Sequence, residues 1–129
     1  MKSITSAAGA PAAVGPYSQA IRAGDTVYCS GQLPVDPATG ELLTGEIGDL
    51  ARCAIANLQA VLAAAGATLG DVVKCTVFMT DLAEFPAMNA AYAELFGSHK
   101  PARSTIQVAA LPLGARLEIE AVAVIGAGD

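Results

Sequence analysis

Apolar and polar residues alternate in two segments near the end of the chain, residues 103–109 and 116–125. Period-two alternation is typical of strands, and the turn-forming residues 111–114 lie between the segments, so we predict a hairpin. One face of the second strand would carry Leu117, Ile119, Ala121 and Ala123, and the other Arg116, Glu118 and Glu120. Such a hairpin would place Arg103 within a few residues of Glu120, so that a guanidinium and a carboxylate could share a site.

The rest of the chain is divided by turn residues in the same way. The sequence pattern first predicts a strand within 15–21 that pairs with a strand over 26–31, and then a loop over 33–47 with one brief strand near Leu42. After the loop it predicts a helix over 48–65, a strand over 71–80, and a helix that follows Asp81 and ends near Gly97. Both faces of the 71–80 strand are largely apolar, as expected of an interior strand that is covered on two sides. The stripe of the second helix is assigned to the core, and it contains Phe85, Met88, Tyr92 and Leu95.

This order of elements predicts the fold class. It is most simply satisfied by an α+β domain over residues 1–129, in which two helices pack on one face of a single mixed sheet. The other face of that sheet is apolar in places, and no predicted element covers it. A second subunit is the simplest cover, so we expect an oligomer.

Composition and charge narrow the function classes. More than half of the 129 residues are apolar, few are aromatic and none is Trp, so the core is built from aliphatic side chains. The formal net charge of −5 argues against nucleic acid as a partner, because its backbone requires a dense field of Lys and Arg. Neither the first residues nor any later apolar run has the pattern of a secretion signal or a membrane span, which predicts a cytoplasmic protein. Cys29, Cys53 and Cys75 are odd in number and far apart, and we interpret them as buried, reduced thiols.

Few side chains offer catalytic chemistry. His99 is the only histidine and has no cysteine or second histidine nearby, which argues against a metal site and a Ser-His-Asp triad. Residues 45–48 lack the spacing of a phosphate-binding loop, so no nucleotide cofactor is indicated.

What remains is Arg103, whose planar fork suits a carboxylate or a phosphate, with the carboxylates that the predicted hairpin would bring near it and the hydroxyls of Tyr17 and Ser30. This set suits a small carboxylate substrate and proton transfer through water. The same charges also suit a solvated strand face with surface ion pairs. The residues alone leave both interpretations open.

Several short motifs occur in a fixed order along almost the whole chain. They are Ala10-Pro11-Ala12-Ala13-Val14-Gly15-Pro16-Tyr17-Ser18-Gln19-Ala20, Ser30-Gly31-Gln32, Asp36-Pro37-Ala38-Thr39-Gly40-Glu41, Asn57-Leu58, Phe85-Pro86-Ala87-Met88-Asn89-Ala90-Ala91-Tyr92, Pro101-Ala102-Arg103-Ser104 and Leu117-Glu118-Ile119-Glu120-Ala121. With them the sequence resembles the RidA (YjgF-type) family of reactive-intermediate, or enamine/imine, deaminases. The resemblance implies a chorismate-mutase-like α+β fold and a homotrimer with three clefts at subunit interfaces. It also implies that neither a metal nor an organic cofactor is needed.

The resemblance further implies a reaction. Family members hydrolyse 2-iminopropanoate and 2-iminobutanoate, or their enamine tautomers, which pyridoxal-phosphate dehydratases release, to a 2-oxo acid and ammonia. By the motifs, Arg103 would bind the substrate carboxylate, Glu118 would position water and accept its proton, and Glu120 would be structural.

The remaining site residues are also implied by the resemblance. The catalytic hydroxyl of Tyr17, together with Ser30, Gly31 and Asn89, matches the family's site lining, with Asn89 contributed across the interface. Many family members have Cys two residues after the motif arginine, where this chain has Thr105. The substrate contact at Thr105 can come from the backbone, so we expect activity to persist.

Two other function classes stay open. A non-catalytic trimer that binds 2-oxo acids or other small carboxylates would use the same arginine. Ribonuclease or translation-inhibitor activity is reported within the family, but the acidic charge and the single histidine argue against it. We therefore expect a small imino or 2-oxo acid as the partner, and neither a nucleic acid nor a membrane.

Overall fold

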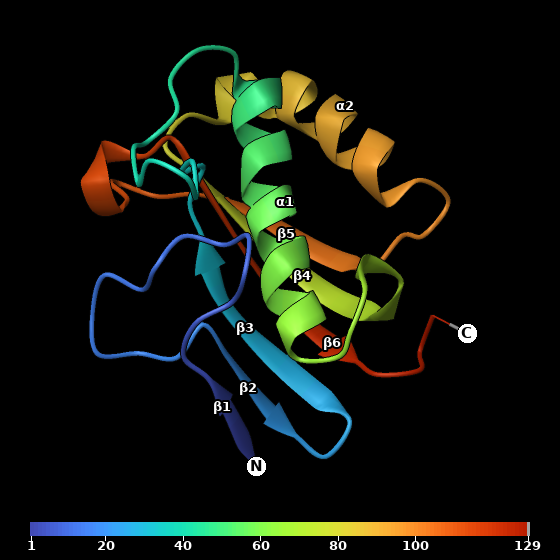
Figure 1. Cartoon of the computed structure of the whole chain (residues 1–129). Coiled ribbons are helices and arrows are strands. Elements are labelled where there is room, and N and C mark those ends of the chain that lie inside the picture. Colours follow the sequence, from blue (N-terminus) through green and yellow to red (C-terminus); the bar gives the residue numbers. More distant parts are fainter. Residues whose placement is uncertain (129) are drawn as a thin grey trace.

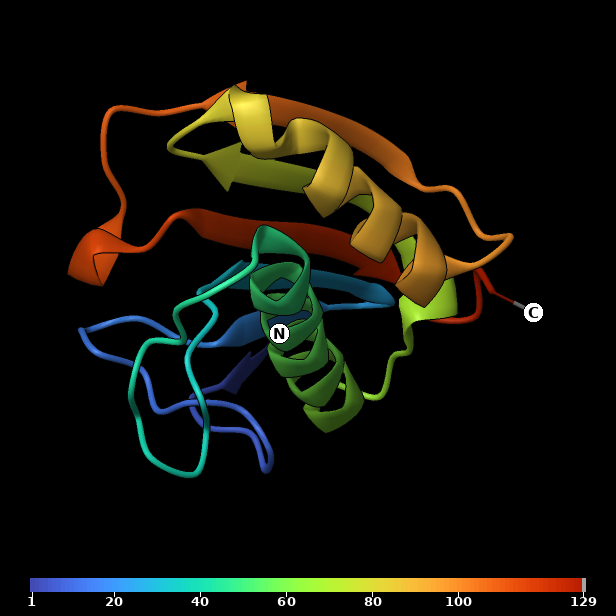
Figure 2. The ribbon, with the colours of Figure 1, turned by 90° about the horizontal axis from the view of Figure 1, so that it is seen from above.

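Six strands form one mixed sheet in the order β1-β2-β3-β6-β4-β5, and two helices cover one of its faces (Figure 1). The structure is a computed structural model that describes residues 1–128. Its elements are β1 (Lys2–Ile4), β2 (Ala20–Ala23), β3 (Thr26–Gln32), α1 (Ile47–Ala64), the 3-10 turn η1 (Leu69–Asp71), β4 (Val72–Met79), η2 (Leu82–Glu84), α2 (Phe85–Phe96), β5 (Ala102–Gln107), η3 (Pro112–Gly114) and β6 (Leu117–Val124). The predicted α+β class, with both helices on one face of a single mixed sheet, is confirmed (Figure 2).

Helix α1 lies at the centre of the core. Its apolar residues recur at helical spacing, and Leu58 and Leu62 are completely buried where α1 packs on β3, β6 and α2. The 18 residues of α1 are long and apolar enough to span a membrane by length and composition, contrary to the expectation that no apolar run reaches that length. Half of them are buried inside the fold, which is typical of a core helix.

The predicted hairpin of residues 103–125 is wrong, although both of its strands exist. β4 lies between them and pairs with β5 in parallel and with β6 antiparallel. Helix α2 carries the chain from the end of β4 back to the start of β5, and a strand-helix-strand connection of this kind produces a parallel pair. β6 then inserts between β3 and β4. The alternation along β5 and β6 could not reveal this, because it defines two faces and not the neighbouring strands.

The other local predictions agree better with the structure. β2 and β3 form the predicted antiparallel hairpin, and the brief strand near Leu42 is a single bridge to Val35. β1 was not predicted, because three residues are too few to show a period. All three cysteines are free thiols, as predicted, and Cys29 and Cys75 are buried, whereas Cys53 is only half-buried.

The face of the sheet opposite the helices carries apolar side chains that stay open to solvent. Tyr28 of β3 is 53% exposed and Ile106 of β5 is 44% exposed. Both helices lie on the other face, so no helix of residues 1–128 covers these side chains (Figure 2). We call this surface the open face.

Candidate functional site

Arg103 lies in β5 and points toward helix α2. It is in register with Cys75 of β4, which is completely buried on the helix-covered face, and paired residues of parallel strands share a face. Its guanidinium carbon lies 4.6 Å from the ring centre of Tyr92 and 5.5 Å from that of Phe85. Its Nη1 donates a hydrogen bond to Oδ1 of Asn89 at 2.8 Å. We call the group formed by Phe85, Asn89, Tyr92 and Arg103 the arginine cradle.

The start of α2 explains why three cradle residues face β5. The carboxylate of Asp81 accepts a hydrogen bond from the Ala83 N–H at 2.9 Å, and Pro86 occupies the first turn of the helix. The two following cradle residues lie four and seven positions after Phe85, which places all three on one stripe of the helix. The same stripe buries Met88 and Tyr92 in the core.

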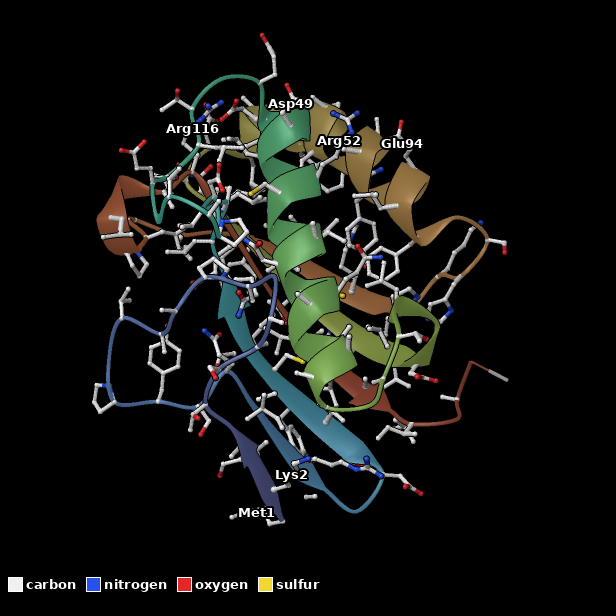
Figure 3. The ribbon with its side chains drawn as sticks, in the orientation of Figure 1. Met1, Lys2, Asp49, Arg52, Glu94 and Arg116 are labelled. Atoms are coloured by element: carbon white, nitrogen blue, oxygen red, sulfur yellow. The ribbon has the colours of Figure 1, made fainter. Side chains whose placement is uncertain are left out.

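Arg103 differs from the other three arginines in its ion pairs. Arg22 pairs with Asp25, Arg52 with Asp49 and Glu94, and Arg116 with Glu84. Figure 3 shows Arg52 with Asp49 and Glu94 around it, at one end of the two helices. Arg103 has no carboxylate partner among residues 1–128, and its Nε and Nη2 find no acceptor there. A half-buried guanidinium with unused donors is suited to binding an anion.

The arginine cradle opens into a groove of about 370 Å³ between the end of α2 and the start of β5. His99 and Lys100 also line this groove. The Nε2 of His99 donates a hydrogen bond to the carbonyl oxygen of Val72 at 2.7 Å, so this histidine ties the chain to β4. The side chains of Arg103 and Lys100 make the groove cationic, and it is large enough for a small carboxylate.

A second cavity, of about 360 Å³, contains the other predicted residues. Its lining includes Tyr17, Ser30, Gly31 and Glu118, together with apolar side chains such as Val14, Leu33 and Leu113. We call this cavity the glutamate pocket.

Hydrogen bonds position the hydroxyls of the glutamate pocket. The Oγ of Ser30 donates a hydrogen bond to the carbonyl oxygen of Ser18 at 2.6 Å. Tyr17 is partly exposed, and its hydroxyl accepts a long hydrogen bond from the Val14 N–H at 3.4 Å. Both hydroxyls keep hydrogen-bonding capacity for a ligand or for water.

A bulge in β3 brings Gly31 against Glu118. The pairing of β3 with β6 shifts by one residue between Cys29 and Gln32, as in a β-bulge. A Cβ atom at Gly31 would lie 2.7 Å from Cδ and from Oε2 of Glu118. A side chain at this position would therefore displace the carboxylate of Glu118 from its place against β3.

The setting of Glu118 favours its protonated form. Burial, and after it the negative charge of Glu120 on the same strand face, raise the pKa of Glu118 above its ordinary value. A carboxylate with a raised pKa holds a proton more strongly, so it accepts a proton from water more readily than an exposed one does.

The arginine cradle and the glutamate pocket lie on opposite faces of the sheet. Arg103 is in register with Cys75, and Glu118 with Phe78, three residues further along β4. Those three residues span about 10 Å, and two strand spacings add about 10 Å in the perpendicular direction. Because the two side chains also point to opposite faces, one chain cannot place both on one small molecule. The predicted proximity of Arg103 to the carboxylates of β6 is therefore wrong within one chain.

The structure thus sorts the predicted residues into two groups and adds two others. Tyr17, Ser30, Gly31 and Glu118 meet in the glutamate pocket, whereas Asn89 and Arg103 meet in the arginine cradle. The Oγ1 of Thr105 is buried and has no hydrogen-bond partner among residues 1–128. Phe85 and Tyr92 were assigned to the core alone. An asparagine between two aromatic residues on one stripe was the signal that could have identified them.

The sequence from residue 7 to residue 125 matches the model of the family described as Endoribonuclease L-PSP. The chain belongs to this family. A family relative from the goat Capra hircus, named 2-iminobutanoate/2-iminopropanoate deaminase, is 49% identical over 98% of this chain and 92% of its own length. The crystal structure of the E. coli YjgF gene product matches with a TM-score of 0.90 and 43% identity, over 95% of this chain and 98% of that one. E. coli TdcF with bound serine matches with a TM-score of 0.90 and 45% identity, over the same shares. The resemblance to the RidA (YjgF-type) family is confirmed.

Proposed function

We propose that this protein is a 2-iminobutanoate/2-iminopropanoate deaminase, which hydrolyses imines or enamines released by pyridoxal-phosphate dehydratases. The observation that carries the proposal is Arg103, which is half-buried and held by a hydrogen bond and two rings, while its other donors have no partner in residues 1–128. This fork suits the α-carboxylate of a small imino acid. The name of the goat relative supports the reaction. The serine on TdcF supports the substrate class, because serine also has a carboxylate beside a nitrogen-bearing carbon.

We infer that the working site forms between two copies of the chain, because the arginine cradle and the glutamate pocket lie on opposite faces of one sheet. Each site would take Arg103, Asn89 and the main chain of Thr105 from one copy, and Tyr17, Ser30, Gly31 and Glu118 from the next. The open face, with its exposed Tyr28 and Ile106, supports such contact. A homotrimer with cyclic symmetry would contain three of these sites.

In this arrangement the two halves divide the chemistry. Arg103 binds the carboxylate and holds the C=N carbon in place. Water forms a bond to that carbon while Glu118 accepts a proton from it, and the hydroxyl of Tyr17 orients the water. Glu118 returns that proton to the nitrogen, which gives a carbinolamine with a hydroxyl and an amino group on the same carbon. Glu118 then takes the proton of the new hydroxyl and passes it to the amino nitrogen, so that the carbonyl forms as the C–N bond breaks and ammonia leaves. One water is consumed, and one ammonia and one 2-oxo acid are released.

Ribonuclease activity is the second candidate, because the matching family model carries that description. The net charge of −5 does not favour contact with an RNA backbone, and the Nε2 of the single histidine, His99, is hydrogen-bonded to Val72. A non-catalytic binder of 2-oxo acids would use the same arginine cradle.

We also propose a cytoplasmic location, where the three free thiols would stay reduced.

A coupled assay tests the proposal. A dehydratase generates 2-aminoacrylate from serine in the reaction vessel, and the appearance of pyruvate is followed with and without the protein. We expect wild-type protein to accelerate pyruvate release, and Arg103→Ala to lower kcat/KM by about a hundredfold or more while it assembles normally. Equal pyruvate release with and without wild-type protein would refute the deaminase function. Binding of 2-oxobutanoate without turnover would favour the binder, and RNA cleavage would favour the ribonuclease.

A further inference from the structure

Tyr92 makes the closer of the two ring contacts to the guanidinium of Arg103, at 4.6 Å against 5.5 Å for Phe85. It is only 7% exposed, and its ring is itself held in place. Phe96, one turn further along α2, stacks on Tyr92 with ring centres 4.5 Å apart and planes inclined by 25°. The ring that contacts the cation is therefore fixed within the packed core.

The hydroxyl of Tyr92 does not explain this placement. It is buried and makes no hydrogen bond of good geometry within residues 1–128, and its polar neighbour is the thiol of Cys75. A buried hydroxyl without a good partner lowers stability. Any benefit of a tyrosine at position 92, to stability or to binding, must then come from its ring, which contacts Arg103 on the helix-covered face.

We propose that Tyr92 is a positioning residue for carboxylate recognition. Its ring fixes the plane of the Arg103 guanidinium, and the hydrogen bond to Asn89 fixes the rotation within that plane, which leaves Nε and Nη2 for the ligand. A carboxylate that binds both donors must be coplanar with them, so a fixed plane preserves affinity. This inference rests on the proposed function, because it assumes that Arg103 binds the substrate carboxylate.

Three single substitutions test this role. Tyr92→Met keeps a large apolar side chain and removes the aromatic face, whereas Tyr92→Phe keeps the ring and removes only the hydroxyl. Leu95→Ala is the control, because it shortens a partly buried side chain of the same helix that packs on the core, makes no cation–π contact with Arg103 and does not line the groove. The readout is the Kd of 2-oxobutanoate measured by calorimetry, together with KM and kcat in the coupled assay.

We expect Tyr92→Met to raise the Kd and the KM by about threefold to thirtyfold, the range of a cation–π contact, and to leave kcat almost unchanged. Tyr92→Phe is expected to bind like wild type, and Leu95→Ala to lose thermal stability without a comparable change in Kd. A wild-type Kd in folded Tyr92→Met would overturn the proposal, as would an equal rise in Kd in all three variants.

A further measurement covers the case in which Tyr92→Met does not fold. In the wild-type protein, the Nε–H of Arg103 is expected to give a resolved NMR signal that is shifted by the neighbouring rings. A signal averaged like that of an exposed arginine would overturn the proposal.

The binding readout also separates this inference from the proposed reaction. Wild-type protein that binds 2-oxobutanoate but has no turnover would refute the deaminase function alone, whereas wild-type protein that does not bind 2-oxobutanoate would overturn the role of Tyr92.

Discussion

The arginine cradle and the glutamate pocket hold their charged groups in different ways. In the arginine cradle, packed side chains fix a guanidinium by two ring contacts and one hydrogen bond. In the glutamate pocket, a carboxylate lies against a glycine at the edge of an apolar cavity, where burial raises its pKa. The first arrangement is suited to binding a fixed charge, and the second is suited to moving a proton.

This difference indicates that ligand affinity and the rate of the proposed chemical step depend on different residues of this protein. Substitutions in the arginine cradle should change ligand affinity, and substitutions in the glutamate pocket should change the rate of the chemical step. Because the two groups lie on opposite faces of one sheet, the proposed site would also divide these two roles between two copies of the chain.

The largest effect confined to the glutamate pocket is expected for Glu118→Gln. Loss of the proton acceptor should lower kcat by about a hundredfold to ten-thousandfold, whereas the Kd of 2-oxobutanoate should change by less than about threefold. Steady-state assays and calorimetry give the two values. A Kd that rises as much as kcat falls would show that Glu118 acts in binding, and the proposed division would be wrong.

The same variant has a predicted effect on stability. The pKa of Glu118 is raised in the folded protein, so as the pH rises the unfolded chain releases this proton first. The folded state therefore loses stability as the pH rises above the ordinary carboxyl range. Glu118→Gln removes the charge and is expected to raise the Tm at pH 7 but not at pH 3. Thermal melts at both pH values would reveal a contrary result, such as a lower Tm at pH 7.

A smaller effect is expected for Gly31→Ala. The added Cβ would lie 2.7 Å from the Glu118 carboxylate, which must move, and a misplaced proton acceptor should lower kcat by about tenfold to a hundredfold. The affinity for 2-oxobutanoate should stay near the wild-type value. Gly48→Ala in α1 is the control, since its Cβ would approach no neighbouring atom more closely than 3.5 Å, an ordinary van der Waals distance. Wild-type kcat in Gly31→Ala would show that the position of the carboxylate is not critical.

The smallest effect is expected for Glu120→Gln. The charge of Glu120 is the second cause of the raised pKa of Glu118, so its removal should lower that pKa. The acid limb of kcat/KM, in which activity is lost as Glu118 becomes protonated, should move to lower pH. Asp25→Asn, which removes an exposed carboxylate in the β2–β3 turn, should leave the limb in place. An acid limb that moves to higher pH in Glu120→Gln would contradict the assignment of that limb to Glu118.

The sequence was sufficient to predict those helices and strands that are marked by the spacing of neighbouring residues along the chain. Helix α1 followed from apolar residues such as Leu58 at helical spacing and from Gly66 beyond its end, and β4 followed from a segment that is apolar on both faces. The position of β6 was not accessible, because its pairing with β4 depends on the crossover through α2. The motif residues Arg103 and Glu118 were identifiable by type, but the pairing decided that they face opposite ways.

The role assigned to α2 shows a second limit of the sequence. Phe85 and Tyr92 have the spacing of a core stripe, and the structure uses the same stripe for packing and for contact with Arg103. Spacing alone cannot separate these uses, because both require a helix face turned toward the sheet. The distinction became visible only when the fourth arginine proved to have no carboxylate partner within residues 1–128.

The most direct test of the central claim is to mix two inactive variants. Arg103→Ala and Glu118→Gln are unfolded together in equal amounts and refolded, and imine hydrolysis is measured. If each site takes Arg103 from one copy and Glu118 from the next, a random mixture places both intact residues at about one site in four, and about a quarter of the wild-type rate should return. Activity no greater than that of the two variants assayed separately, in a mixture shown to contain both chains in one assembly, would contradict the claim.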